Sequence, residues 1–203
     1  NQTTKNTITS TAMAYDIAAL QHLYAANNLY NSEDTTYSYN PEIPFIETIW
    51  DGGGEDTLDL SNFSKTQTIN LNDGASSSIG FDVNWSMNNN LAIAFNAIIE
   101  NVKGGSNADL ITGNKYKNNI QGNAGNDSIN GGVGSDTSTY SGKFADYSFT
   151  RGTGTLQLAD QRTSGTTDGT DTLKNIEYIQ FSDQTVEESK VDVVKTYSGN
   201  FSD

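Results

Sequence analysis

Acidic and amide side chains recur at every ninth position between Gly104 and Asp136, in a pattern suited to binding a hard metal cation. In four frames of nine residues, each opening on glycine, the sixth position is occupied by Asp109, Asn118, Asp127 and Asp136. A calcium ion requires roughly six to eight oxygen ligands, from carboxylates, amides and backbone carbonyls. Glycine at the frame starts permits positive φ, so that carbonyl oxygens can crowd toward one point. The repeat therefore predicts calcium-binding turns.

The eighth position of each frame is aliphatic or small, which predicts a short strand with this side chain pointing inward. These positions are Ile111, Ile120, Ile129 and Ser138. One turn cannot supply all the ligands, but two stacked turns can. If two frames form one coil of a parallel β-roll, each turn stacks on the turn eighteen residues later, which pairs Asp109 with Asp127 and Asn118 with Asp136. The alternative, a flexible Gly/Asn-rich linker, would have neither a fixed period nor a phased aliphatic residue.

The same spacing sets limits on the roll. Eighteen residues after Asp127 the chain has Ala145, so we expect the roll to lose its ligands there. In the other direction Glu100 is in phase with Asn118 and can serve as a ligand at the start of the repeat. The roll is therefore expected to occupy residues 98–140.

Composition narrows the class of protein. Of the 203 residues, 34% are hydrophobic, and 25 acidic residues outnumber 11 basic ones, for a net charge of −14. This charge opposes compaction unless cations neutralise it, and it argues against nucleic acid or an anionic membrane as a partner. The sequence has no cysteine and no apolar run long enough to span a membrane. Because residues 1–10 are polar and the chain does not begin with Met, we expect a processed or excised fragment rather than a signal peptide.

The elements that must position the repeat can be outlined from the hydrophobic pattern. Residues 11–28 predict one helix, with Thr11 as its cap, and residues 146–161 predict a β-hairpin. The predicted fold is all-β: a parallel β-roll flanked by short antiparallel strands, with one N-terminal helix. The predicted divisions are a loose N-terminus at 1–12, a helix plus strands entering the roll at 13–97, the roll at 98–140, roll-closing strands at 141–186 and an acidic tail at 187–203.

Four segments of the chain carry a resemblance to a known family. They are AYDIAALQHLYAANN (14–28), EDTTYSYN (33–40), WDGGGEDTLDLSNF (50–63) and IIENVKGGSNADLITGN (98–114). In this order they resemble the C-terminal domain of serralysin-type (M10) metalloproteases, which contains an RTX calcium-binding β-roll. Residues 145–186 instead resemble the segment that closes β-rolls in RTX epimerases and haemolysin-like proteins.

The resemblance implies two calcium ions before the repeat. The first would be held by Asn31, Glu33, Thr35, Asp51, Gly53 and Asp56. The second would be held by Gly54, Asp56, Ile98 and Glu100. Asp56 would bridge the two ions.

Within the repeat, the resemblance implies further ions. One would be held by Gly105, Asn107, Asp109, Gly122, Ala124 and Asp127. Another would be held by Asn114, Tyr116, Asn118, Gly131, Val133 and Asp136. The uncharged Asn118 should weaken this last site. Asn123, Gly125 and Asp127 suggest an additional ion, although the turn expected to pair with them is degraded.

The segment DGTDTL at 168–173, followed by Glu177, leaves two interpretations open. Asp168, Asp171 and Glu177 are either further ion ligands or solvated turn acids, since Asp is a common turn residue.

Catalytic motifs are missing from the sequence. His22 is the only histidine, so the zinc-protease motif HExxH cannot be formed, and no GxSxG segment occurs. Trp50 and Trp85 could stack on sugars, yet Trp in a sheet more often belongs to the core. We therefore expect a chain that is not an enzyme by itself.

Two hypotheses follow. The first is the non-catalytic calcium-binding domain of a secreted, extracellular serralysin-like protease, folding with Ca²⁺ after type I secretion and supporting an upstream catalytic domain. The alternative is an accessory RTX module that binds a polysaccharide, a cell surface or a protease partner. A complete enzyme is a third interpretation, which the missing zinc ligands oppose.

Overall fold

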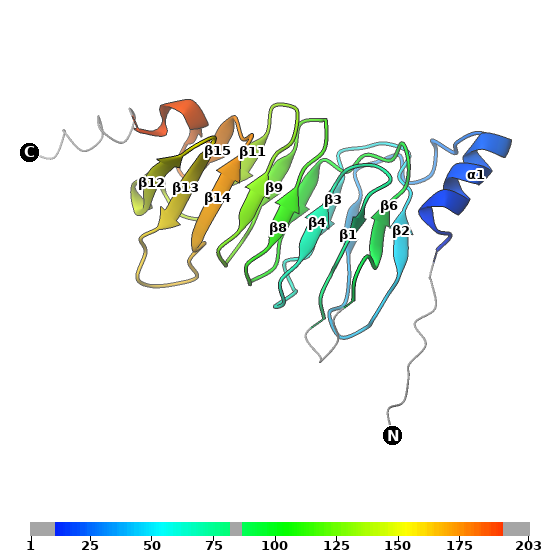
Figure 1. Ribbon diagram of the computed structural model, residues 1–203, viewed down its shortest axis with the longest axis horizontal. Helices are drawn as coiled ribbons and strands as arrows, with labels where there is room; N and C mark the ends of the chain where they lie inside the picture. Colours follow the sequence, from blue (N-terminus) through cyan, green and yellow to red (C-terminus); the bar gives the residue numbers. More distant parts are fainter. Residues whose placement is uncertain (1–10, 82–86, 193–203) are drawn as a thin grey trace, which may run out of the picture.

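The computed structural model describes residues 11–81 and 87–192 of the chain. They form an elongated all-β roll, with the helix α1 (Ala14–Tyr24) at one end and an antiparallel hairpin near the other (Figure 1). The strands are mostly three residues long, because each coil alternates a brief strand with a turn. The predicted fold class is confirmed.

Two sheets face each other across the core of the roll. The first has the strand order β1 (Thr36–Ser38), β3 (Thr57–Asp59), β7 (Asn101–Lys103), β9 (Asn119–Gln121), β11 (Thr137–Thr139), β15 (Tyr178–Gln180) and β16 (Thr185–Glu187). The second has the order β12 (Tyr147–Gly152), β13 (Thr155–Asp160), β14 (Thr170–Lys174), β10 (Ser128–Asn130), β8 (Leu110–Thr112) and β4 (Thr68–Asn70). A small sheet near α1 contains β2 (Glu47–Ile49), β6 (Leu91–Ile93) and β5 (Ser76–Ser77). Two short 3₁₀ helices, η1 (Phe144–Asp146) and η2 (Glu188–Lys190), lie in the closing segment.

The pairing register confirms that two frames make one coil. Ile129 pairs with Ile111, and Ile120 pairs with Val102, each eighteen residues apart in parallel strands. The inward side chains of successive coils are almost fully buried and stack on one another. Even Ser138, at the same position of the last frame, is completely buried.

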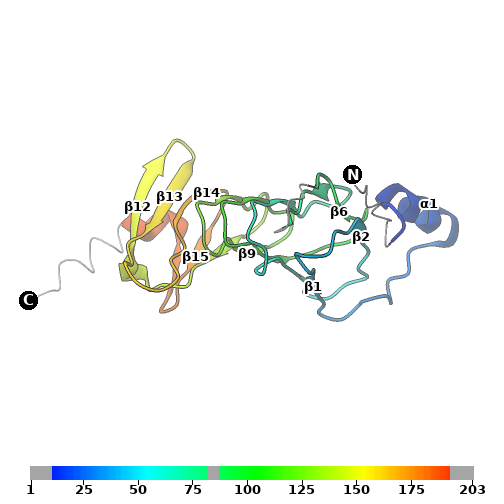
Figure 2. The ribbon, with the colours of Figure 1, turned by 90° about the horizontal axis from the view of Figure 1, so that it is seen from below.

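Parallel pairing extends well beyond residues 98–140 on both sides. Before the repeat, β1 pairs with β3, β3 with β7 and β4 with β8. After it, β10 pairs with β14 and β11 with β15. The expectation that the roll ends at residue 140 is wrong, because the chain leaves the roll there, forms the hairpin β12–β13 and returns in register. Figure 2 shows this hairpin, predicted at 146–161, standing out from the roll.

An aromatic cluster closes the core beneath the hairpin. Its members are Tyr140, Phe144, Tyr147, Phe149 and Phe181, whose ring centroids lie within contact distance of one another. Stacked and edge-to-face pairs of this kind add to the stabilisation from burial. The cluster thus replaces the aliphatic stack at the end of the roll.

The N-terminal helix is shorter than predicted and is capped differently. It ends at Tyr24, and its N-cap is Met13, whose backbone N–H donates to the Asp16 carboxylate at 3.2 Å. Thr11 is not the cap, because its hydroxyl oxygen accepts the Thr48 backbone N–H at 2.7 Å. Only Ala14 of the helix is buried. Within the described ranges, no helix has the length and apolar character needed to cross a membrane.

Two further predictions touch undescribed residues. The hydrophobic pattern at 79–83 predicts a further strand. No strand is formed at residues 79–81, although Ile79 and Phe81 are buried, and residues 82 and 83 lie outside the described ranges. Of the predicted acidic tail, residues 187–192 are described and include η2.

Candidate metal centre

The sixth-position residues of the repeat line up in two rows, one along each sheet, together with the residues at the same register of the other coils. Each member lies immediately before a paired strand or at its start. The first edge row comprises Thr35, Asp56, Glu100, Asn118, Asp136 and Glu177. The second edge row comprises Gln67, Asp109, Asp127 and Asp171. The strand register brings each member next to the same position of the neighbouring coil.

Backbone-to-carboxylate hydrogen bonds connect neighbouring members of a row. The Asp109 N–H donates to Asp127 Oδ1 at 2.8 Å, and the Asn118 N–H donates to Asp136 Oδ1 at 2.9 Å. The two pairs expected from the eighteen-residue spacing therefore lie together. Each bond fixes one oxygen of the carboxylate, and the second oxygen takes no part in it.

Within the described part of the chain, the second oxygen of three carboxylates is buried and has no hydrogen-bond partner. Asp56, Asp127 and Asp136 are at most 2% exposed, and Oδ2 of each accepts no hydrogen bond from another described residue. A buried ionised oxygen without a partner is costly, and buried charges in proteins are usually paired or coordinate a metal. The donor set therefore fits a calcium ion, which would be coordinated by such oxygens together with nearby carbonyl groups.

The electrostatics of the rows point the same way. Burial raises the pKa of Asp127 to about 7, and charge repulsion from Asp109 and Asp168 adds to this effect. Burial likewise raises the pKa of Asp171 to about 8, with added repulsion from Asp127 and Asp168. Burial also raises the pKa of Asp109 to about 6, against the opposing hydrogen bonds from Gly105 and Gln67. Burial in the rows thus favours the neutral form of these carboxyl groups.

Among the described residues, no group of three or more His, Cys, Asp or Glu side chains converges as a metal-binding cluster. Any ion in the rows would therefore depend on one or two carboxylates and several backbone carbonyls. Glycines in the turns allow the backbones of stacked turns to approach each other closely. A Cβ at Gly125 (φ +133°) would lie 2.7 Å from the carbonyl oxygen of Asn107, and one at Gly134 (φ +148°) would lie 2.6 Å from that of Tyr116.

The remaining repeat residues of the implied sites occupy the same stacked turns. The Gly105 N–H donates to Asp109 Oδ2 at 2.6 Å, and Asn123 Nδ2 donates to the carbonyl oxygen of Gly104 at 2.6 Å. The Val133 N–H donates to the carbonyl oxygen of Asn114 at 3.2 Å. Three others lie in these turns: Gly122 and Gly131 are buried and Ala124 is half-buried.

The residues implied for the first ion before the repeat are close together. The Thr35 N–H donates to Asp56 Oδ1 at 2.8 Å, and the Gly53 N–H donates to Asp51 Oδ1 at 2.8 Å. A Cβ at Gly54 would lie 2.7 Å from the carbonyl oxygen of Glu33, so these two turns also stack.

One residue of this region was missed in the sequence. Tyr37 donates its hydroxyl proton to Asp51 Oδ2 at 2.6 Å and accepts Asn31 Nδ2 at 3.0 Å. Its position at the centre of β1, in register with Leu58, was the available signal, because that position points toward the core.

Two residues implied for the second ion before the repeat, Asp56 and Glu100, are in contact. The Asp56 N–H donates to Glu100 Oε2 at 2.8 Å, across 44 residues of sequence. Asp56 therefore contacts both neighbouring coils, as its expected bridging role requires. Burial raises its pKa to about 7, with further contributions from Asp51 and Glu100. Ile98 lies in the same turn as Glu100.

The turn that was expected to be degraded after Asp127 is present. The Asp127 N–H donates to Asp171 Oδ1 at 2.8 Å, and Gly169 lies so close to Gly125 that a Cβ would clash with its carbonyl oxygen. The Asp136 N–H likewise donates to Glu177 Oε2 at 2.7 Å. Asp171 and Glu177 thus continue the two rows beyond the hairpin.

Asp168 has a different environment. Its carboxylate accepts the Ser141 N–H at 2.9 Å, the Ser141 hydroxyl at 2.7 Å and the Tyr147 hydroxyl, and it pairs with Arg162 at 3.3 Å. These contacts tie the hairpin to the closing segment. The geometry gives Asp168 a structural role there.

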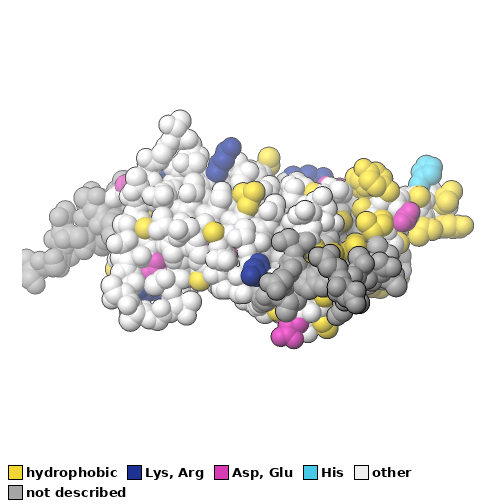
Figure 3. Space-filling model, turned by 60° about the horizontal axis from the view of Figure 1, so that its bottom comes forward, with side chains coloured by type: hydrophobic (Ala, Val, Ile, Leu, Met, Phe, Trp, Pro, Cys, Tyr) yellow, Lys and Arg dark blue, Asp and Glu magenta, His cyan; other side chains and the backbone are white. Residues whose placement is uncertain are grey.

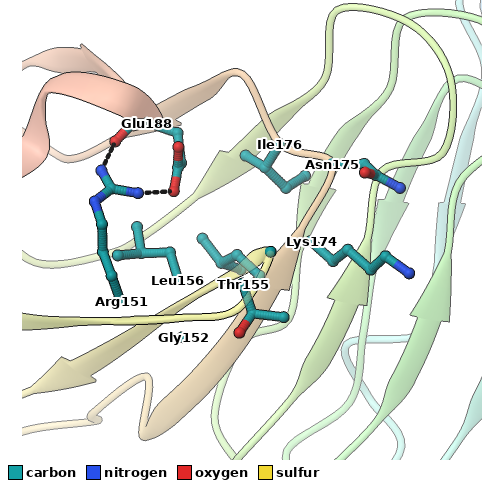
Figure 4. A pocket seen from close by; sticks show the side chains of 10 residues that line it. Arg151, Gly152, Thr155, Leu156, Lys174, Asn175, Ile176 and Glu188 are labelled. Atoms are coloured by element: carbon teal, nitrogen blue, oxygen red, sulfur yellow. Dashed lines mark hydrogen bonds and ion pairs between the residues drawn. The ribbon is translucent and has the colours of Figure 1, made fainter.

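Other features of the described chain offer no catalytic arrangement. His22 is exposed on α1, and the Trp50 indole N–H donates to the Asn27 carbonyl oxygen at 3.2 Å, while Trp85 lies outside the described residues. A cavity of about 290 Å³ lies between the hairpin and η2. Figure 4 shows Arg151 in this cavity, and it is joined to Glu188 by an ion pair of 2.7 Å.

The raised pKa values give a pH prediction. In calcium-depleted buffer, the free energy of unfolding should fall as the pH rises from about 5 to about 8. The folded-state pKa values of about 6 to 8 lie above the ordinary value of 3.8, so the folded chain binds more protons than the unfolded chain. Stability is therefore highest at low pH and is lost as these carboxyls ionise.

The β-sheet circular dichroism of the calcium-depleted chain across this pH range provides the measurement, and it should fall as the pH rises. With saturating calcium the fall should disappear, because the metal stabilises the ionised carboxylates. A β-sheet signal that rises in calcium-depleted buffer between about pH 5 and about pH 8 would contradict the assigned pKa directions.

Comparison with known proteins gives a consistent relationship. The family described as Peptidase M10 serralysin C terminal matches residues 19–202. Metallopeptidase AprA of Pseudomonas marginalis is 42% identical over 117 residues, which cover 52% of this chain and 24% of that protein. Serralysin of Photorhabdus laumondii is 37% identical over 128 residues, covering 57% of this chain and 26% of that protein. Serralysin G of Dickeya chrysanthemi is 39% identical over 121 residues, covering 54% and 24%. The chain thus spans about a quarter of the length of these relatives.

Proposed function

This chain belongs to the Peptidase M10 serralysin C-terminal family, and from that premise we propose that it is the calcium-binding, non-catalytic module of a secreted serralysin-type metalloprotease. The observation that carries the proposal is the set of buried, unpartnered oxygens of Asp56, Asp127 and Asp136. A divalent cation between stacked turns would neutralise them and would be held by carboxylate and carbonyl oxygens.

Calcium binding would make folding depend on whether the chain is inside or outside the cell. Extracellular calcium modules bind with Kd values on the order of 10⁻⁴–10⁻³ M, so their sites stay empty at cytosolic calcium levels. Without the ions, the net charge of −14 and the buried carboxylates oppose the compact state. The chain would remain exportable inside the cell, and it would fold outside after type I secretion.

The helix supports the presence of an upstream catalytic domain. Leu20, Leu23 and Tyr24 are between 51% and 79% exposed, which is unusual for apolar side chains on one short helix. Figure 3 shows hydrophobic side chains gathered at this end of the molecule. The relatives are about four times as long as the matched segment, so a preceding domain of the same protease is the occupant we propose for this surface.

A refolding titration tests the function. Chain diluted from urea into increasing calcium should regain its β-sheet circular dichroism with a midpoint on the order of 10⁻⁴–10⁻³ M, and magnesium should not substitute. The same folded chain, supplied with zinc, should show no peptide hydrolysis. Complete refolding in calcium-depleted buffer, or zinc-dependent hydrolysis, would refute the proposed function.

A further inference from the structure

The step from Glu100 to Asn118 in the first edge row differs from the other steps. Elsewhere a backbone N–H donates to the carboxylate of the next coil, as the Asn118 N–H does to Asp136. Here the direction is reversed, because Asn118 Nδ2 donates to the Glu100 carbonyl oxygen at 3.0 Å. That carbonyl oxygen already accepts the Asn119 N–H at 3.1 Å, so the amide occupies its second lone pair.

A second amide completes this arrangement. Asn114, which is 5% exposed, donates from Nδ2 to the carbonyl oxygens of Ile99 at 2.9 Å and Leu71 at 3.3 Å. The Asn114 side-chain oxygen accepts the Tyr116 N–H at 2.9 Å and Asn118 Nδ2 at 3.2 Å. Two amide groups thus direct their N–H donors at three carbonyl oxygens within one step of the roll.

At the same frame position, the aspartates present a hydrogen-bond acceptor instead of a donor. Asp127 and Asp136 each present a buried oxygen with no donor, whereas Asn118, completely buried at the same frame position, presents a donor. Carbonyl oxygens that face a calcium ion are satisfied equally well by N–H groups, since both are electropositive. An amide does this without adding negative charge.

We propose that the Asn114–Asn118 amide pair takes the place of a calcium ion between the Glu100 and Asn118 coils, so that this step of the roll forms without metal. The proposal rests on the calcium-binding function above and refines it. It also implies that an ion near Asp136 does not use the side chains of Asn114 and Asn118 as ligands.

Replacing Asn118 by Asp tests the proposal. Asn118→Asp exchanges the donor for a carboxylate oxygen and should convert the step into a cation site. Native mass spectrometry in excess calcium should show one more bound ion per chain than in the wild type. At a limiting calcium concentration that just keeps the wild type folded, the variant should unfold at a lower urea concentration. Asn119→Asp, which adds the same charge at the exposed neighbouring position, should change neither result.

The outcomes separate the two proposals. The wild-type count tests the proposed function, which fails if no calcium is bound. The difference between variant and wild type tests the amide pair, and an unchanged count in Asn118→Asp would overturn it. Should that variant not fold in calcium, Asn114→Asp gives the same test at the other amide. Failure of both variants to fold in calcium would also overturn the proposal, because a cation should replace the lost donors.

Discussion

Chelating calcium from the folded chain is expected to abolish most of its β-sheet circular dichroism. A site held at about tenfold its Kd adds roughly 1.4 kcal/mol to the free energy of unfolding. Domains of this kind have a total stability of about 5–15 kcal/mol, so several sites together approach the whole. The unpartnered oxygens of Asp56, Asp127 and Asp136 would add a penalty once the ions leave.

The measurement is a far-ultraviolet spectrum before and after excess EDTA at neutral pH. Calcium added beyond the chelator should restore the original spectrum, and EDTA already saturated with calcium serves as the control. A spectrum that EDTA leaves unchanged would show that the roll holds together without metal, against the proposed mechanism.

Asp127→Asn should have the second-largest effect, and it should act in opposite directions with and without calcium. The variant keeps an oxygen to accept the Asp109 N–H but loses the charged Oδ2. It should bind at least one calcium ion fewer, and each lost site should remove about 1.4 kcal/mol of calcium-dependent stabilisation at tenfold Kd. In calcium-depleted buffer the variant should retain more β-sheet circular dichroism than the wild type, because a buried charge has been removed.

Asn118 gives a structural basis for the expected gain in stability, because its amide donates to the carbonyl oxygen of the preceding coil. The new amide would face the Asp109 carbonyl oxygen, which accepts the Ser128 backbone N–H at 2.9 Å and has a second lone pair to offer. The urea midpoint with calcium and the β-sheet signal that remains in EDTA give the two effects. Glu42→Gln removes one charge from an exposed residue and should alter neither value. A variant less stable than the wild type in both buffers would argue for a purely structural role of Asp127.

The repeat could be predicted because its information is local. A nine-residue period with a phased aliphatic residue fixes the strand, the turn and the inward face, and two frames per coil set the register between Ile111 and Ile129. This reasoning placed Asp109 beside Asp127 and Asn118 beside Asp136, as the structure shows.

The partners of Asp127 and Asp136 beyond the repeat could not be found in this way. Asp171 and Glu177 follow after 44 and 41 residues, because a hairpin is inserted between one turn and the next. Parallel pairing requires only that the chain return in register, whatever the length of the excursion. Periodicity carries no information about that length, so the spacing rule pointed to Ala145.

The direction in which the Asn118 side chain donates could not be predicted either. The sequence identifies Asn118 as an uncharged member of the repeat, which predicts weaker binding. Only the structure shows where its amide points, because the acceptors belong to Glu100 and to Asn114, on two different turns. The helix cap was missed for a similar reason, since the hydroxyl of Thr11 is taken by Thr48.

The most direct measurement of the central claim is anomalous diffraction from crystals grown with calcium. The stacked turns of Asp109 and Asp127 should hold an anomalous peak, with carboxylate and carbonyl oxygens at about 2.3–2.6 Å from it. A second peak is expected where Asp56 meets Glu100. Water-like density without an anomalous signal at both positions would contradict calcium binding by this roll.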